Sequence, residues 1–169
     1  EQARFYEQYK NKGMQKTRLR LTEEMWRRFV FHKDEDWFMS QIMATISEAV
    51  VQHNLIDMKT RGIRRKDARD ITSDPLLFSK IFSSVTLALN VAPPAVFLNE
   101  QNPGDMAFYP LTDKQGPLPS VVVGSALLQG RTEKDLALLL GRKVALLRAD
   151  HLVRWPTLVE QLAQLKAFV

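Results

Sequence analysis

Residues 132–151, TEKDLALLLGRKVALLRADH, carry the pattern that most constrains the fold of this chain. Thr132 and Asp135 stand three positions apart, a spacing similar to the capping box that opens many helices. Apolar residues then recur at helical spacing, which predicts a helix with one buried face; they are Leu136, Leu140, Val144 and Leu147. A buried strand is predicted just before this helix, at 120–123. We therefore expect the helix to pack against a small sheet.

The same helix has the outline of a zinc-peptidase helix without its ligands. A zincin helix reads H-E-x-x-H, in which two His bind zinc from one face and the Glu acts as general base. The five matching positions here are Arg142-Lys143-Val144-Ala145-Leu146. Arg stays protonated and only donates hydrogen bonds, and a Leu side chain has no lone pair to offer. The sequence thus predicts no metal, no cofactor and no catalytic residue in this motif.

Other weak motifs surround this helix in a fixed order. A predicted helix at 78–90 leads through the turn Val91-Ala92-Pro93-Pro94 to a strand at 95–98. They are followed by Met106-Ala107-Phe108, Ser120-Val121-Val122-Val123-Gly124, Ala126-Leu127-Leu128 and the trailing His151. In this order, the chain from about Asp74 to His151 resembles the family of the CAAX prenyl proteases and heat-shock membrane metallopeptidases. Degenerate copies of this kind are similar to domains attached to tetratricopeptide-type repeats in large bacterial proteins.

The resemblance implies an α+β, zincin-like fold. We expect a sheet of about three strands on the pseudo-catalytic helix, with helices at both ends of the chain. Residues 1–72 are predicted to be an N-terminal helical extension, and residues 73–169 the degenerate metallopeptidase-like domain. Residues 111–119 are predicted to be a polar loop, and 55–72 a loop or short helix. The C-terminal helix should bury one apolar stripe, made of Trp155, Leu158, Leu162, Leu165 and Val169.

Three helices are predicted in the extension, at 1–12, at 21–31 with Thr22 as its cap, and from the acidic start at 34–36 to about His53. The second helix has an apolar face that comprises Met25, Trp26, Phe29 and Val30. The third has an apolar face at helical spacing, which predicts burial in the core; it comprises Phe38, Ile42, Met43, Ile46, Ala49 and Val50. A partner surface, suggested by the Met and Trp residues, is the alternative interpretation.

The positive charge of the chain is concentrated before residue 71. The net charge is +5, of which +4 falls in residues 1–70. A basic run at 61–70 could contact phosphates; its cations are Arg61, Arg64, Arg65, Lys66 and Arg69. Asp67 and Asp70 lie within the run, which favours a solvated loop with internal ion pairs. Nucleic-acid binding through this run is therefore the alternative to a protein-interaction role.

Composition restricts the remaining function classes. The chain has no Cys, which is typical of a reducing compartment, so a cytoplasmic location is expected. No run of 18 apolar residues is present, so no membrane span is expected. The only His residues are His32, His53 and His151, and no two have metal-ligand spacing. A cryptic hydrolase remains a further alternative. We expect a non-catalytic interaction or scaffold module that contacts protein partners or adjoining domains of the same chain.

Overall fold

The computed structural model describes residues 20–99, 104 and 106–153. Its centre is a four-stranded mixed sheet in the order β1–β3–β4–β2. The strands are β1 (Ile56–Asp57), β2 (Ala95–Asn99), β3 (Met106–Asp113) and β4 (Gly116–Gly124). β3 and β4 are antiparallel, whereas β1 runs parallel to β3 and β2 runs parallel to β4. The fold combines α and β structure, as predicted, and the sheet has four strands instead of about three.

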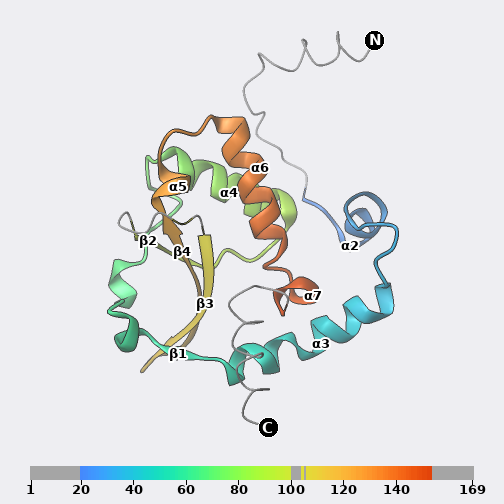
Figure 1. Cartoon of the computed structure of the whole chain (residues 1–169), viewed down its shortest axis with the longest axis horizontal. Coiled ribbons are helices and arrows are strands. Elements are labelled where there is room, and N and C mark those ends of the chain that lie inside the picture. The colour runs from blue at the N-terminus through green and yellow to red at the C-terminus, as the bar shows by residue number, and fades with distance from the viewer. Residues whose placement is uncertain (1–19, 100–103, 105, 154–169) are drawn as a thin grey trace.

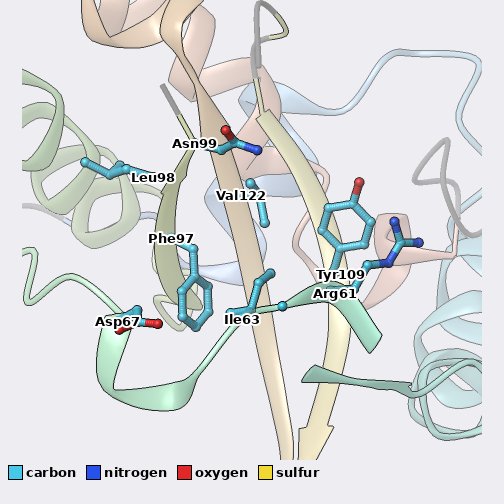
Figure 2. A pocket seen from close by; sticks show the side chains of 9 residues that line it. Arg61, Ile63, Asp67, Phe97, Leu98, Asn99, Tyr109 and Val122 are labelled. Carbon is cyan, nitrogen blue, oxygen red and sulfur yellow. The ribbon is translucent and has the colours of Figure 1, made fainter. Parts of the chain in front are cut away.

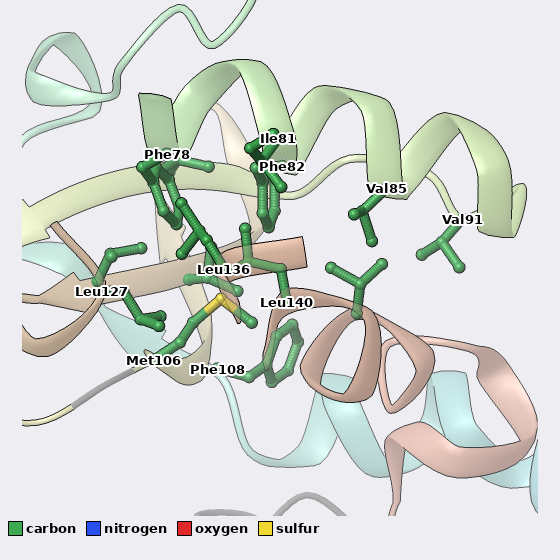
Figure 3. Close-up of a cluster of buried hydrophobic side chains, with 14 residues drawn as sticks. Phe78, Ile81, Phe82, Val85, Val91, Met106, Phe108, Leu127, Leu136 and Leu140 are labelled. Carbon is green, nitrogen blue, oxygen red and sulfur yellow. The ribbon is translucent and has the colours of Figure 1, made fainter. Parts of the chain in front are cut away.

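Helices α4 (Leu77–Leu89) and α6 (Glu133–Ala145) contact each other over one face of the sheet (Figure 1). Figure 3 shows Phe78 and Phe82 of α4 pointing toward Leu136 and Leu140 of α6. The two phenyl rings stack with their centroids 5.5 Å apart. Alternate strand residues complete this core, as the pleat of a sheet requires; they are Val96, Met106, Phe108, Val121 and Val123. The buried stripe predicted for α6 is confirmed at Leu136, Leu140 and Val144, whereas Leu147 follows the helix and is partly buried against the same core.

The start of α6 is also confirmed. The Thr132 side chain accepts a hydrogen bond from the Asp135 backbone N–H at 3.2 Å, and it is itself 2.7 Å from the Asp135 carboxylate. This arrangement satisfies one of the N–H groups that a helix start leaves without an intrahelical partner.

A second, smaller core lies on the opposite face of the sheet. It consists of Met58, Phe97 and Leu111, which are almost fully buried. The segment that covers it contains β1 and two short 3₁₀ helices, η2 (Met58–Arg61) and η3 (Arg65–Asp67). The expectation of a loop or short helix at 55–72 is therefore correct for η2 and η3 but missed β1. Two residues are too few to show the alternation that predicts a strand.

The prediction of a polar loop at 111–119 is wrong. Strands β3 and β4 continue through this region and join in a tight turn at Lys114 and Gln115, with Gly116 at a φ of 105°. Pro110, Pro117 and Pro119 lie within the ladder, although proline cannot donate a backbone hydrogen bond. β2 pairs only with residues 120–124. Within the described residues, no strand therefore pairs with the outer side of β4 at Pro117 and Pro119, where a backbone N–H donor would be needed.

The N-terminal helices lie to one side of the sheet (Figure 1). A short helix, α2 (Glu23–Met25), continues into a π-helical turn, η1 (Trp26–Val30), and α3 (Trp37–His53) follows. Thr22 and Asp36 cap α2 and α3 through their side chains, which confirms both predicted starts. After the sheet come α5 (Ser125–Leu128) and, beyond α6, α7 (Ala149–Leu152), which packs against α3. Within the described ranges, no helix has both the length and the apolar character needed to cross a bilayer.

The prediction that the apolar faces of these two helices are core is largely wrong. In the second helix Trp26 is buried, but Phe29 and Val30 are exposed. The buried residues of α3 are Ser40 and Ser47, whereas Phe38, Ile42 and Ile46 are exposed. Small side chains on α3 allow close packing with α7, so the larger apolar residues point elsewhere. The predicted helix at 1–12 and the predicted C-terminal helix from Trp155 lie outside the described residues.

Candidate functional site

The positions that match H-E-x-x-H occupy the last turn of α6 and its C-cap. Arg142 is exposed, and Lys143 is partly buried. Val144 is fully buried, and Leu146, the C-cap residue, packs against the same core. Of the two positions that match the His residues of the motif, Arg142 therefore faces solvent and Leu146 contributes to the core.

His151, the trailing His of the motif series, lies on α7 and contacts other parts of the chain. Its Nδ1 is 3.7 Å from the Glu35 carboxylate, and its Nε2 is 3.9 Å from the Asp150 carboxylate. The edge of its ring meets Phe31, with centroids 5.6 Å apart. His151 therefore belongs to the junction between α7 and the N-terminal helices, apart from Arg142.

Arg148 is the centre of that junction. Its guanidinium donates hydrogen bonds to Asp150 at 3.0 Å and to Glu23 at 2.8 Å, and it lies 4.4 Å above the ring centroid of Trp26. Burial alone would lower the pKa of Arg148, but the hydrogen bonds to Glu23 and Asp150 raise it above its usual value. Trp26 in turn donates from its indole N–H to the Leu89 carbonyl at 3.1 Å. These contacts attach the N-terminal helices to α4 and α7.

Sequence reasoning did not single out Arg148. The residue is separated from Glu23 by 125 positions, so no local spacing reports the pair. The one available signal is the short spacing between Arg148 and Asp150, next to His151.

The basic run at 61–69 is a folded segment whose cations are largely engaged. Arg64 pairs with Asp67 at 2.8 Å, and Arg65 forms two hydrogen bonds of 2.8 Å to the Asp113 carboxylate. The hydrogen bond from Arg65 holds the pKa of Asp113 below its usual value. The predicted internal ion pair is therefore present, and a second pair joins the run to the β3–β4 hairpin.

Arg61, Lys66 and Arg69 complete the predicted set. The Arg61 guanidinium lies 5.1 Å from the ring centroid of Tyr109 on β3. The Arg69 backbone N–H donates to the Val96 carbonyl at 2.7 Å, which joins the segment to the edge of β2. Lys66 is exposed. The side chains of Arg61, Arg64 and Arg65 thus contact three different neighbours, namely Tyr109, Asp67 and Asp113.

A shallow pocket of about 390 Å³ lies between this segment and the open face of the sheet. Figure 2 shows Ile63, Phe97 and Val122 inside it, with Arg61 and Tyr109 side by side at its rim. Asp67, also at the rim, is bonded to Arg64, and this hydrogen bond lowers its pKa. The pocket offers an apolar floor and one cation over an aromatic ring, without an acid–base pair suited to hydrolysis.

The Arg65–Asp113 pair predicts a pH-dependent contribution to stability. The pKa of Asp113 is lower in the folded state, so its stabilising effect is present above the unfolded pKa of about 3.8 and disappears as pH falls through the folded value. We expect Asp113→Asn to lower the thermal midpoint at pH 7. The difference from the wild type should shrink in acid, measured by circular dichroism. Lys114→Gln is the matched control in the same turn, and an Asp113→Asn effect independent of pH would contradict the assignment.

A different surface combines large apolar side chains with solvent exposure. Phe38, Met39, Ile42 and Ile46 of α3 are 71%, 41%, 37% and 40% exposed. They follow the helical spacing of one face, and we call them the α3 apolar face. The sequence identified Phe38, Ile42 and Ile46 as an apolar face and assigned it to the core. The abundance of Ser and Ala on the opposite side of α3 is the signal that could have corrected this assignment.

The chain matches no protein-family model, no curated protein sequence and no solved structure. Among the described residues, no group of three or more His, Asp or Glu side chains is arranged to hold a metal ion. Glu160, the only acidic residue after Asp150 in the sequence, lies outside the described residues.

Restoring the motif tests how much of a zinc site these elements could supply. We expect Arg142→His with Lys143→Glu and Leu146→His to give weak zinc affinity at best, measured by calorimetry. Two imidazoles would lack a third ligand and the hydrogen bonds that orient them. Leu146 also packs against the core, so the new imidazole would displace apolar contacts. Tight zinc binding with peptidase activity would contradict this expectation; the control is Arg142→Ala with Lys143→Ala.

Proposed function

We propose that this chain is a non-catalytic interaction module with a zincin-like fold, a pseudo-metallopeptidase that joins protein partners or adjoining parts of the same chain. We place it in a larger intracellular assembly of bacterial origin, consistent with its lack of Cys. The observation that carries the proposal is the α3 apolar face. Single exposed apolar residues are ordinary, but several on one face of one helix are typical of a contact surface.

The chemistry at the motif positions supports the non-catalytic part of the proposal. An active zinc site needs lone pairs from three protein ligands and a position for water. Neither Arg142 nor Leu146 has a lone pair to offer a metal. The ring nitrogens of His151 lie close to the carboxylates of Glu35 and Asp150. Leu146 instead packs against the core beside α6, and His151 contributes to the contacts of α7.

The nucleic-acid alternative has weaker support. Affinity for a phosphate backbone depends on cations that are free to replace counterions. Arg64 and Arg65 are paired with Asp67 and Asp113, and Arg61 lies over Tyr109. Binding through this run would have to compete with these contacts.

The experiment uses a thiol as a reporter of burial, since the chain has no Cys of its own. Ile46→Cys places the thiol on the α3 apolar face. Glu48→Cys, two residues further along, places it on the exposed opposite flank as the control. In the cells that produce the protein, we expect a maleimide to alkylate the Ile46→Cys thiol at least about tenfold more slowly, because something covers that face. Equal rates for the two thiols in the cell would contradict the proposal.

A further inference from the structure

The pocket beside η2 lies on a part of the sheet where the side chains leave a hollow (Figure 2). Phe97 of β2 pairs with Val122 of β4, and both side chains lie on the face opposite the α4–α6 core. Two residues further along β2, Asn99 pairs with Gly124, which has no side chain. Tyr109 of β3 lies on the same face, two residues from the row of Val122 in the other direction. The space above Val122, between Asn99 and Tyr109, is therefore open to a ligand.

A well-defined turn presents Arg61 at the rim of this pocket. Arg61 ends η2, and Gly62 follows with a φ of 64°, a left-handed conformation that glycine adopts without strain. The N–H groups of Gly62 and Ile63 donate to the carbonyls of Lys59 and Met58, both at 3.0 Å. Met58 is itself buried in the second core. The backbone on both sides of Arg61 is thus held in place by the fold.

Arg61 differs from its neighbours in the basic run, because none of the described carboxylates pairs with it. Arg64 and Arg65 each form an ion pair with an aspartate. The Arg61 guanidinium instead lies 5.1 Å from the ring centroid of Tyr109. A cation over a ring is held by the charge distribution of the ring and spends no hydrogen bond on it. Within the described part of the chain, the N–H donors of Arg61 therefore stay available to an anion in the pocket.

The surroundings of Arg61 favour a carboxylate over a phosphate ester. Asp67, although bonded to Arg64, also lines the rim, so the pocket carries one cation and one anion. A dianion would be repelled by the Asp67 carboxylate. Phosphate sites usually add several free backbone N–H groups, but those of Gly62 and Ile63 are already bonded to carbonyls. A guanidinium can hold a single carboxylate through two parallel hydrogen bonds.

The floor of the pocket indicates the rest of the ligand. Ile63, Phe97 and Val122 present an apolar surface, against which a planar ring can bury one of its faces. This burial supplies affinity that a single cation at the rim does not. The volume of about 390 Å³ lies toward the lower end of the usual range for small-molecule sites, which suits one or two rings.

We propose that this pocket binds a small aromatic monocarboxylate, with its ring over Phe97 and Val122 and its carboxylate on Arg61. The inference goes beyond the proposed interaction role and uses no residue of the α3 apolar face. Failure of the thiol-protection experiment and failure of the ligand experiment below are therefore separate results.

The test is a titration of the full chain, labelled with nitrogen-15, with 2-naphthoate as the probe. We expect saturable shifts of the amide signals of η2, Ile63 and β2, with a Kd of about 1 mM or tighter, ordinary for a ligand of this size. 2-Naphthamide has the same rings without the charge and should bind at least about tenfold more weakly. Arg61→Gln should weaken naphthoate binding by at least about tenfold as well. Lys66→Gln removes an exposed cation from the same segment and is the matched control, which should bind like the wild type.

Several results would overturn the proposal. They are an absence of saturable shifts, equal affinity for naphthoate and naphthamide, equal affinity of Arg61→Gln and the wild type, or shifts confined to the α3 apolar face. 2-Naphthyl phosphate is titrated in parallel, and tighter binding of this dianion than of naphthoate would refute the carboxylate class. The comparison of naphthoate with naphthamide needs no substitution, so it decides the question even if circular dichroism shows that Arg61→Gln disturbs the fold.

Discussion

Leu140→Ala should lower the free energy of unfolding by about 2–5 kcal/mol, the usual range for truncating a fully buried Leu. Leu140 is completely buried between α4 and the sheet, so the smaller side chain would leave a cavity among Phe82, Val121 and their neighbours. Urea denaturation followed by circular dichroism measures the change. Leu138→Ala is a matched control on the same helix, because Leu138 is 68% exposed. Its effect should stay within about 0.5 kcal/mol. Equal effects for the two substitutions would contradict the packing of α6.

Arg148→Ala should cost about 3–5 kcal/mol, because it leaves the buried Asp150 carboxylate without its cation. The Arg148 and Asp150 side chains are only 11% and 4% exposed. The substitution also removes the guanidinium from the face of Trp26. We therefore expect the N-terminal helices to loosen, detected as faster hydrogen exchange of the amides of α2 and η1.

Arg142→Ala is the control for charge and side-chain type, since Arg142 is an exposed arginine on α6. It should leave both stability and exchange nearly unchanged. If Arg148→Ala were equally mild, the junction described around Trp26 and Asp150 would not be what holds the N-terminal helices in place.

Local signals predicted the elements whose residues interact with near neighbours. The start of α6 follows from Thr132 and Asp135, and its buried stripe follows from Leu136 and Leu140, which lie one turn apart. The acidic residues at 34–36 located the start of α3, where Asp36 is the N-cap and its carboxylate accepts from the Phe38 and Met39 N–H groups. Side-chain caps and helical periodicity are contained in short windows of sequence, so one chain suffices to find them.

Features set by distant partners could not be predicted. Pro117 and Pro119 favoured a loop, yet both lie in β4, where the neighbouring strand β2 pairs only from Ser120 onward. Phe38 is exposed because α3 packs on α7 through the side that carries Ser40 and Ser47, and α7 lies about one hundred residues later in the chain. No window of sequence contains both partners.

The candidate sites likewise have properties that the sequence predicts and positions that only the fold determines. The sequence identified Arg142 and Leu146 as residues unable to bind zinc, and this follows from their chemistry alone. Their positions, one facing solvent and one against the core, emerge only from the fold. Arg148 was missed because its partners Glu23 and Trp26 lie at the other end of the described chain.

We propose that this domain acts through its surfaces and without metal chemistry. Elemental analysis of the full chain, purified without chelators and after growth with added zinc, is the test. We expect far less than one zinc per chain, unchanged in Arg142→Ala, because a cation and an alkyl group stand where two imidazoles would bind the metal. One tightly held zinc per chain, retained through dialysis, would contradict a non-catalytic role without metal.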